Sequence, residues 1–146
     1  RSWEPLPLPP FEPGRTQGAC LKSSLVIISG GDGGSIGPRV LRLRKSTGAA
    51  GGRWEWDTSL PSLPANASRI TGSAHAIDDR WLVFGLGNAN GPAASKAGAL
   101  VPYRLDLLKP APLWEPMAPY PLSVSLAREI AVPISAVVDG KWLVFG

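Results

Sequence analysis

A tryptophan, an arginine and a glycine recur three times in the same order, and this recurrence constrains the fold more than any other feature of the chain. A Pro/Leu-rich stretch separates the tryptophan from the arginine, and two short apolar runs separate the arginine from the glycine. Equivalent anchors lie roughly 50 to 60 residues apart, a period that is too long for most helical repeats and suits one four-stranded sheet per unit. Unit by unit, the anchors are Trp3, Arg15 and Gly30; Trp54, Arg69 and Gly85; Trp114, Arg128 and Gly146.

The two apolar runs of each unit predict a β-hairpin. In the third unit they flank Asp139–Gly140, a dipeptide that favours a two-residue hairpin turn because glycine adopts positive φ at little cost. The runs are rich in β-branched and aromatic residues and too short for a core helix. They are Gly18–Leu21 with Leu25–Ile28, Gly72–Ile77 with Trp81–Phe84, and Ile134–Val138 with Trp142–Phe145.

Third and fourth strands complete each unit. Residues 39–45 alternate leucine with arginine, which is typical of a strand with one buried face. Residues 100–107 have the same place in the second unit. Leu43 and Tyr103 precede the next tryptophan by equal distances, so we expect them to be equivalent, with that tryptophan opening the fourth strand. With 16 prolines and 17 glycines, the chain is predicted to be all-β without long helices.

At these positions the sequence resembles the kelch-repeat β-propeller family. That family has a glycine doublet after the second strand, as in Gly30–Gly31, and an aromatic residue in the third strand, as in Tyr103. The second unit departs from the pattern with Gly85-Leu86-Gly87, and Leu43 stands where the family usually has tyrosine. The resemblance implies an incomplete β-propeller of four-stranded antiparallel kelch-type blades over residues 1–146. Its units are about 3–53, 54–113 and a truncated 114–146.

Because propellers close with four to eight blades, we expect this chain to be a segment of a longer protein. It would then pack against the remaining blades of the same propeller, since such repeats cannot bury their faces alone. A β-sandwich is the alternative fold, although a sandwich does not require the repeated Trp, Arg and Gly.

The resemblance implies a non-catalytic scaffold that binds a partner protein through the loops connecting its blades. The alternative is part of a sugar-acting kelch-like enzyme, an oxidase of the galactose oxidase kind or an epimerase-like protein, whose active site lies outside this segment. We expect no catalytic, cofactor-binding or metal-binding residues here, because one histidine and one cysteine cannot supply a set of three or four such ligands. Tyr103 and Tyr120 are the only tyrosines.

The histidine, the cysteine, and the recurring arginines and tryptophans are interpreted as structural residues in preference to functional ones. His75 is expected to share a face with Ser73 and Ile77 and to bond a neighbouring loop, with a site on a central channel as the alternative. Cys20 is expected to be a small buried hydrophobic residue. The recurring arginines are expected to join loops or blades, and the recurring tryptophans to pack between sheets. Whether Asn66, in an Asn-Ala-Ser acceptor pattern, is glycosylated stays open.

The net charge of +4 allows an acidic partner, but the basic cluster at 39–45 is also explained by charges that protect an outer strand from edge pairing. Nucleic acid is not expected, because no aromatic residue interrupts that cluster. A membrane is not expected, because no apolar stretch approaches the ~20 residues of a spanning helix. The glycine-rich stretches at 30–37 and 85–91 lack nucleotide-binding fingerprints and are interpreted as inter-strand connections.

Overall fold

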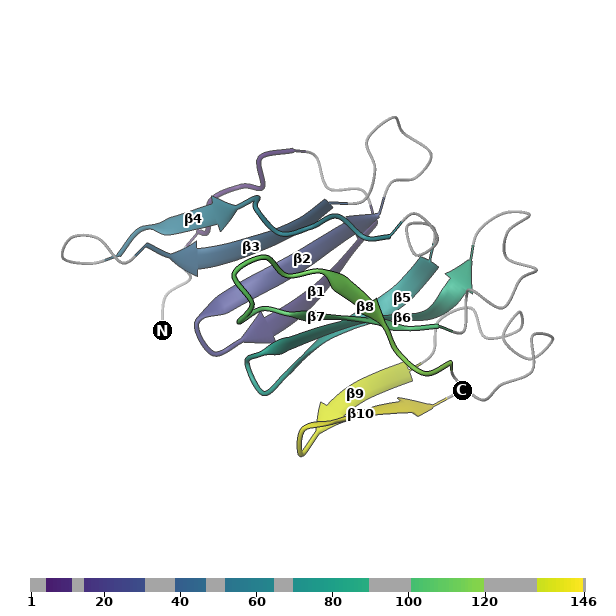
Figure 1. The fold of residues 1–146 in the computed structure, drawn as a ribbon. Coiled ribbons are helices and arrows are strands. Elements are labelled where there is room, and N and C mark those ends of the chain that lie inside the picture. Colours follow the sequence, from purple (N-terminus) through teal and green to yellow (C-terminus); the bar gives the residue numbers. More distant parts are fainter. Residues whose placement is uncertain are drawn as a thin grey trace.

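The computed structural model contains two four-stranded antiparallel sheets and a separate β-hairpin (Figure 1). It describes residues 5–11, 15–30, 39–46, 52–64, 70–89, 101–119 and 134–145, and within these ranges every regular element is a strand. Sheet 1 comprises β1 (Arg15–Leu21), β2 (Ser24–Gly30), β3 (Arg39–Lys45) and β4 (Trp54–Asp57). Sheet 2 comprises β5 (Ile70–Ile77), β6 (Trp81–Ala89), β7 (Tyr103–Asp106) and β8 (Trp114–Pro116). Hairpin 3 comprises β9 (Ile134–Val138) and β10 (Lys141–Phe145).

Each sheet is formed by four strands that are consecutive in the chain and pair only with their neighbours. The all-β prediction is confirmed, as are the three hairpins and the third and fourth strands of the first two units. In the turn of hairpin 3, Asp139 and Gly140 have φ of 49° and 69°, the geometry that the Asp-Gly pair predicted. Each tryptophan begins the fourth strand of the sheet that the preceding hairpin started. The predicted units, which begin at a tryptophan, therefore do not coincide with the sheets: each sheet ends shortly after the next unit has begun.

Sheet 1 packs face to face on sheet 2 around one hydrophobic core, with their first strands β1 and β5 in contact (Figure 1). Leu60 and Leu63, in the segment that follows β4, pack into the same core. Burying a leucine or phenylalanine side chain contributes about 2 kcal/mol, so this interface contributes strongly to stability. The buried members of the core are Ala19, Val26, Ile28, Val40, Leu63, Ala74, Leu82, Phe84, Tyr103 and Leu105.

The strand register defines which residues of the two sheets are equivalent. Directly paired residues in sheet 1 form the row Leu25, Leu43 and Trp56. The matching row in sheet 2 is Leu82, Leu105 and Trp114. The indole Nε1 of Trp56 donates to the Pro7 carbonyl at 3.0 Å, and that of Trp114 donates to the Pro61 carbonyl at 3.0 Å. The counterpart of Trp114 is therefore Trp56.

This corrects the predicted alignment by two residues. Trp54 pairs with Lys45, whose ammonium group lies 5.4 Å from the indole centroid, and so occupies a different place in its sheet. Leu43 corresponds to Leu105, and Tyr103 corresponds to Leu41. A shift of two residues along a strand keeps every side chain on its face, so the alternation of the sequence does not distinguish the two alignments.

Gly85, one of the repeated glycines, has a specific backbone role. Its φ of 142° lies in a region that side-chain-bearing residues rarely adopt, and it borders a β-bulge that shifts the register between β5 and β6. A Cβ on Gly85 would come within 2.8 Å of the Pro102 Cα, and a Cβ on Gly72 would overlap the Gly85 carbonyl group. Both positions require glycine because three backbone segments approach one another closely here.

Hairpin 3 contacts sheet 2 through the face that carries Ser135 and Trp142, and not through the face that carries Leu143. Leu143 matches the buried Leu82 in the shared WLVFG segment, yet Leu143 is 38% exposed. Trp142 and Ser135 face β5 instead, where Ser135 bonds Ser73 and His75. An apolar face placed against these polar groups would leave them without partners, and this favours the serine-bearing face.

Candidate interaction surface

A cluster of charged and aromatic side chains lies on the face of sheet 2 that is turned away from sheet 1. Its members come from the β5–β6 turn, from β6 to β8, and from the connection between β7 and β8. We call this cluster the Arg–Trp surface. It consists of Arg80, Trp81, Arg104, Asp106, Leu108, Lys109, Leu113 and Glu115.

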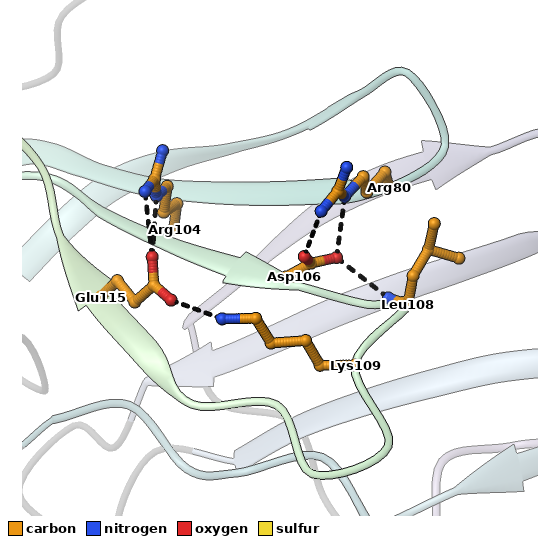
Figure 2. A network of polar contacts seen from close by, with 6 residues as sticks. All are labelled: Arg80, Arg104, Asp106, Leu108, Lys109 and Glu115. Atoms are coloured by element: carbon orange, nitrogen blue, oxygen red, sulfur yellow. Dashed lines mark hydrogen bonds and ion pairs between the residues drawn. The ribbon is translucent and has the colours of Figure 1, made fainter.

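Asp106 is the buried centre of the first half of the surface (Figure 2). Arg80 donates to both of its carboxylate oxygens, from Nε at 3.1 Å and from Nη2 at 2.7 Å, and the Leu108 N–H donates at 3.1 Å. The hydrogen bond from Arg80, together with that backbone N–H, holds the pKa of Asp106 below its usual value against the opposing effect of burial. The carboxylate thus fixes both the Arg80 side chain and the start of the β7–β8 connection.

Glu115 joins two cations in the second half of the surface (Figure 2). Lys109 Nζ donates to Oε1 at 2.8 Å, and Arg104 Nε donates to Oε2 at 3.1 Å. These hydrogen bonds, the one from Lys109 first, lower the pKa of Glu115. Because Arg104 and Glu115 are directly paired on β7 and β8, this contact also links the two outer strands of the sheet.

Trp81 is contacted by both arginines. The guanidinium carbons of Arg80 and Arg104 each lie 4.7 Å from the centroid of its ring, within the range of a cation–π interaction. Each arginine is thus held by a carboxylate and by the indole. The β7–β8 connection, which also carries Lys109, contains two exposed leucines, Leu108 and Leu113.

A second, smaller polar cluster joins sheet 2 to hairpin 3. The Ser135 hydroxyl lies 2.6 Å from the Ser73 hydroxyl and 2.8 Å from His75 Nε2. Burial lowers the pKa of His75, since desolvation disfavours the imidazolium. The prediction that His75 and Ser73 share a face is confirmed, and the partner of His75 lies on strand β9 rather than in a loop. The Trp142 ring lies 6.1 Å from the His75 ring, and its buried Nε1 has no hydrogen-bond partner among the residues that the structure describes.

Cys20 does not occupy the predicted buried position. It is exposed, whereas its neighbour Ala19 is in the core, because successive residues of a strand point to opposite faces. The face of sheet 1 that carries Cys20 is the one turned away from sheet 2.

The predicted repeat positions are described only in part. Trp114 packs against the core and Tyr103 is buried within it, in line with the expected packing role of aromatic residues. Gly30 ends β2 and pairs with the backbone of Arg15. Several predicted positions lie outside the described residues, namely Trp3, Gly31, Asn66, Arg69, Tyr120, Arg128 and Gly146, as does the side chain of Arg15.

The basic segment at 39–45 forms local contacts. Leu41 and Leu43 are buried and Arg44 is exposed, as the alternation predicted, but Val40 on the arginine face is buried as well, in the core between the sheets. Arg42 Nε donates to the Ser24 hydroxyl at 3.0 Å, and Arg44 Nη2 lies 3.4 Å from an Asp57 carboxylate oxygen. Partial burial acts to raise the pKa of Asp57, but hydrogen bonds from Ser59 and the charge of Arg44 lower it overall.

Sequence reasoning did not identify the Arg–Trp surface, because its members are spread over 36 residues with no common spacing. The available signal was the pairing of basic and acidic residues on the predicted third and fourth strands. Arg104 and Glu115 could have been matched as cross-strand partners, whereas the contact of Arg80 with Asp106 depends on the β5–β6 turn.

Comparison of the chain with protein-family models, with curated proteins and with solved structures finds no match. Within the described ranges, no three His, Cys, Asp or Glu side chains form a group that could hold a metal ion. The same part of the chain contains no helix that is long and apolar enough to cross a bilayer.

Proposed function

We propose that this chain is part of a kelch-type β-propeller and acts as a non-catalytic scaffold that binds a partner protein through its connecting loops. The observation that carries this proposal is the repeated tryptophan contact. Trp56 and Trp114 occupy the same register position in two successive sheets, and each bonds a proline carbonyl of the Pro/Leu stretch that precedes its own sheet. A repeated contact of this kind is what successive blades require.

The sheet topology also supports the proposal. Each sheet contains four consecutive strands, as in a propeller blade, and no described strand crosses from one sheet to the other. In the alternative β-sandwich, Greek-key connections place consecutive strands in different sheets. The first strands also follow one another in space, since β1 contacts β5 and β5 contacts β9.

Site-specific photo-crosslinking tests the binding role. Benzoylphenylalanine is placed at Leu108, in the β7–β8 connection, and at Val26, in the core, as a matched position that no partner reaches. We expect a discrete protein adduct from position 108 in native extract, followed by binding of the purified partner to the unmodified chain. The enzyme alternative would instead be supported if no adduct formed at positions in the connecting loops and the protein oxidised a sugar alcohol in a copper-dependent reaction.

A further inference from the structure

We propose that the Arg–Trp surface binds an acidic segment of a partner protein that also carries an apolar side chain. This inference rests on the proposed role in protein binding and names the part of the surface and the chemistry of the partner. It follows from four features of the surface: the exposure of its charges, their fixed geometry, its adjacent leucines and the occupation of its indole ring.

The cations of the surface are accessible, whereas one of their two counter-ions, Asp106, is almost fully buried and the other, Glu115, is somewhat less exposed than the cations. The side chains of Arg80, Arg104 and Lys109 are 48%, 46% and 51% exposed. Asp106 is only 2% exposed and Glu115 is 35% exposed. An approaching ligand therefore meets guanidinium and ammonium groups before it meets carboxylates. This charge distribution is complementary to an anionic segment.

The two arginines are already held in place. Each is fixed by a carboxylate on one side and by the Trp81 ring on another, so binding immobilises few additional rotamers. Ordering a long side chain at an interface otherwise costs conformational entropy. Guanidinium groups also retain free N–H donors after pairing with one carboxylate, because arginine has five. A second carboxylate can use these donors.

Two leucines distinguish this surface from a purely electrostatic patch. Leu108 and Leu113 are 71% and 72% exposed, and they lie at the two ends of the same short connection. Single exposed leucines are common on protein surfaces, but here a pair accompanies fixed cations. The combination favours a peptide with carboxylates and an apolar side chain over a simple anion.

Nucleic acid fits the surface less well. A base would need an aromatic face for stacking, yet two guanidinium groups contact the Trp81 ring. We therefore assign the surface to an acidic protein segment.

The test uses a fluorescein-labelled peptide of alternating glutamate and leucine, and a second peptide with glutamine in place of glutamate. Fluorescence anisotropy measures the binding of each peptide to the full chain. We expect Lys109→Gln to weaken binding of the glutamate peptide about fivefold, which corresponds to about 1 kcal/mol, and Leu113→Ser to weaken it by a similar factor. Lys141→Gln is the matched control, since it removes the same charge from exposed β10 and should leave the affinity within about twofold.

The inference is overturned by equal binding of both peptides, by an equal effect of Lys141→Gln, or by an affinity that neither surface substitution changes. Leu113→Ser alters no ion pair, so it remains informative if Lys109→Gln disturbs the Glu115 contacts. Tighter binding of a single-stranded oligonucleotide than of the glutamate peptide would also contradict the proposal. If peptide binding fails while crosslinking identifies a partner at other loops, this inference is wrong and the proposed binding function stands.

Discussion

At the scale of single residues, the hydrogen bonds of the indole groups determine which positions repeat. The chain contains six tryptophans, and Trp54 and Trp56 lie two residues apart on the same face of β4. Of these two, it is Trp56 that donates to a proline carbonyl in the manner of Trp114. The repeated feature is therefore the hydrogen bond from an indole to a proline carbonyl. A tryptophan at the start of the fourth strand does not by itself identify the repeated position.

Replacing the equivalent tryptophans should give similar losses of stability. We expect Trp56→Phe and Trp114→Phe each to lower the free energy of unfolding by about 1 kcal/mol, because each leaves a carbonyl without its indole donor. Trp54→Phe should have less than half that effect, since its ring contacts the exposed Lys45. Urea unfolding monitored by circular dichroism measures all three. A larger loss for Trp54→Phe than for Trp56→Phe would contradict the two-residue correction.

Cys20 should react with a thiol reagent in the folded protein. Because its side chain is exposed on β1, we expect Ellman's reagent to titrate about one thiol per chain without denaturant. A Cys20→Ser chain provides the blank. Reaction that begins only after urea is added would show that the thiol is covered.

At the scale of elements, sheet 2 has two different faces. One is apolar and packs against sheet 1, and the other carries the Arg–Trp surface and the His75 cluster. The apolar face supplies most of the stability, whereas the polar face contributes contacts that depend on pH. This face carries two kinds of titratable group, carboxylates and a histidine. Their contributions to the stability of the protein are lost in different pH ranges.

Acid should weaken the outer strands of sheet 2. The pKa values of Asp106 and Glu115 are lowered in the folded state, so the stability they contribute is present above their unfolded values of 3.8 and 4.5 and is lost as the pH falls below them. Thermal unfolding of the wild-type chain between about pH 6 and pH 3 should show this loss. Asp106→Asn should be less stable at neutral pH and should lose less on acidification. A slope equal to that of the wild type would exclude Asp106 as its source.

His75 should produce a separate and milder dependence. Burial lowers its folded pKa below the unfolded value of 6.5, so the unfolded chain binds more protons and stability falls as the pH drops from 6.5 towards the folded value. His75→Gln can still bond Ser135 and does not titrate, so we expect its stability to stay flat between about pH 7 and pH 5.5. Urea midpoints at these two pH values measure the difference. An unchanged slope in the variant would place the titration elsewhere.

At the scale of the whole molecule, the two sheets follow a common plan and hairpin 3 departs from it. Sheet 2 turns its Leu82 face to sheet 1, whereas hairpin 3 turns the opposite face to sheet 2 and leaves Val138 and Leu143 exposed. The sheet interface therefore does not extend unchanged to the third hairpin. This departure is the feature of the structure that agrees least with a regular propeller.

Matched leucine substitutions test this departure. Leu82→Ala should lower the free energy of unfolding by about 2–5 kcal/mol, because it leaves a cavity in the core. Leu143→Ala, at the matching position of the WLVFG segment, should change it by less than about 0.5 kcal/mol. Comparable losses at both sites would indicate that hairpin 3 packs through its leucine face, as a regular repeat of sheets requires.

The amino-acid sequence was sufficient to predict the all-β class, the hairpins, the order of strands within each sheet and the burial of Leu41 and Leu43. These features depend on the alternation of apolar and polar residues along a strand and on the residues of its turns, and both can be read from neighbouring positions in the sequence. Other features became evident only from the folded structure. They are the correspondence of Trp56 with Trp114, the exposure of Cys20, the ion pair of Arg80 with Asp106, and the face through which hairpin 3 contacts sheet 2. The physical reason is the two-residue period of a strand: it fixes which side chains share a face, but pairing register and the choice of covering surface depend on contacts between distant segments.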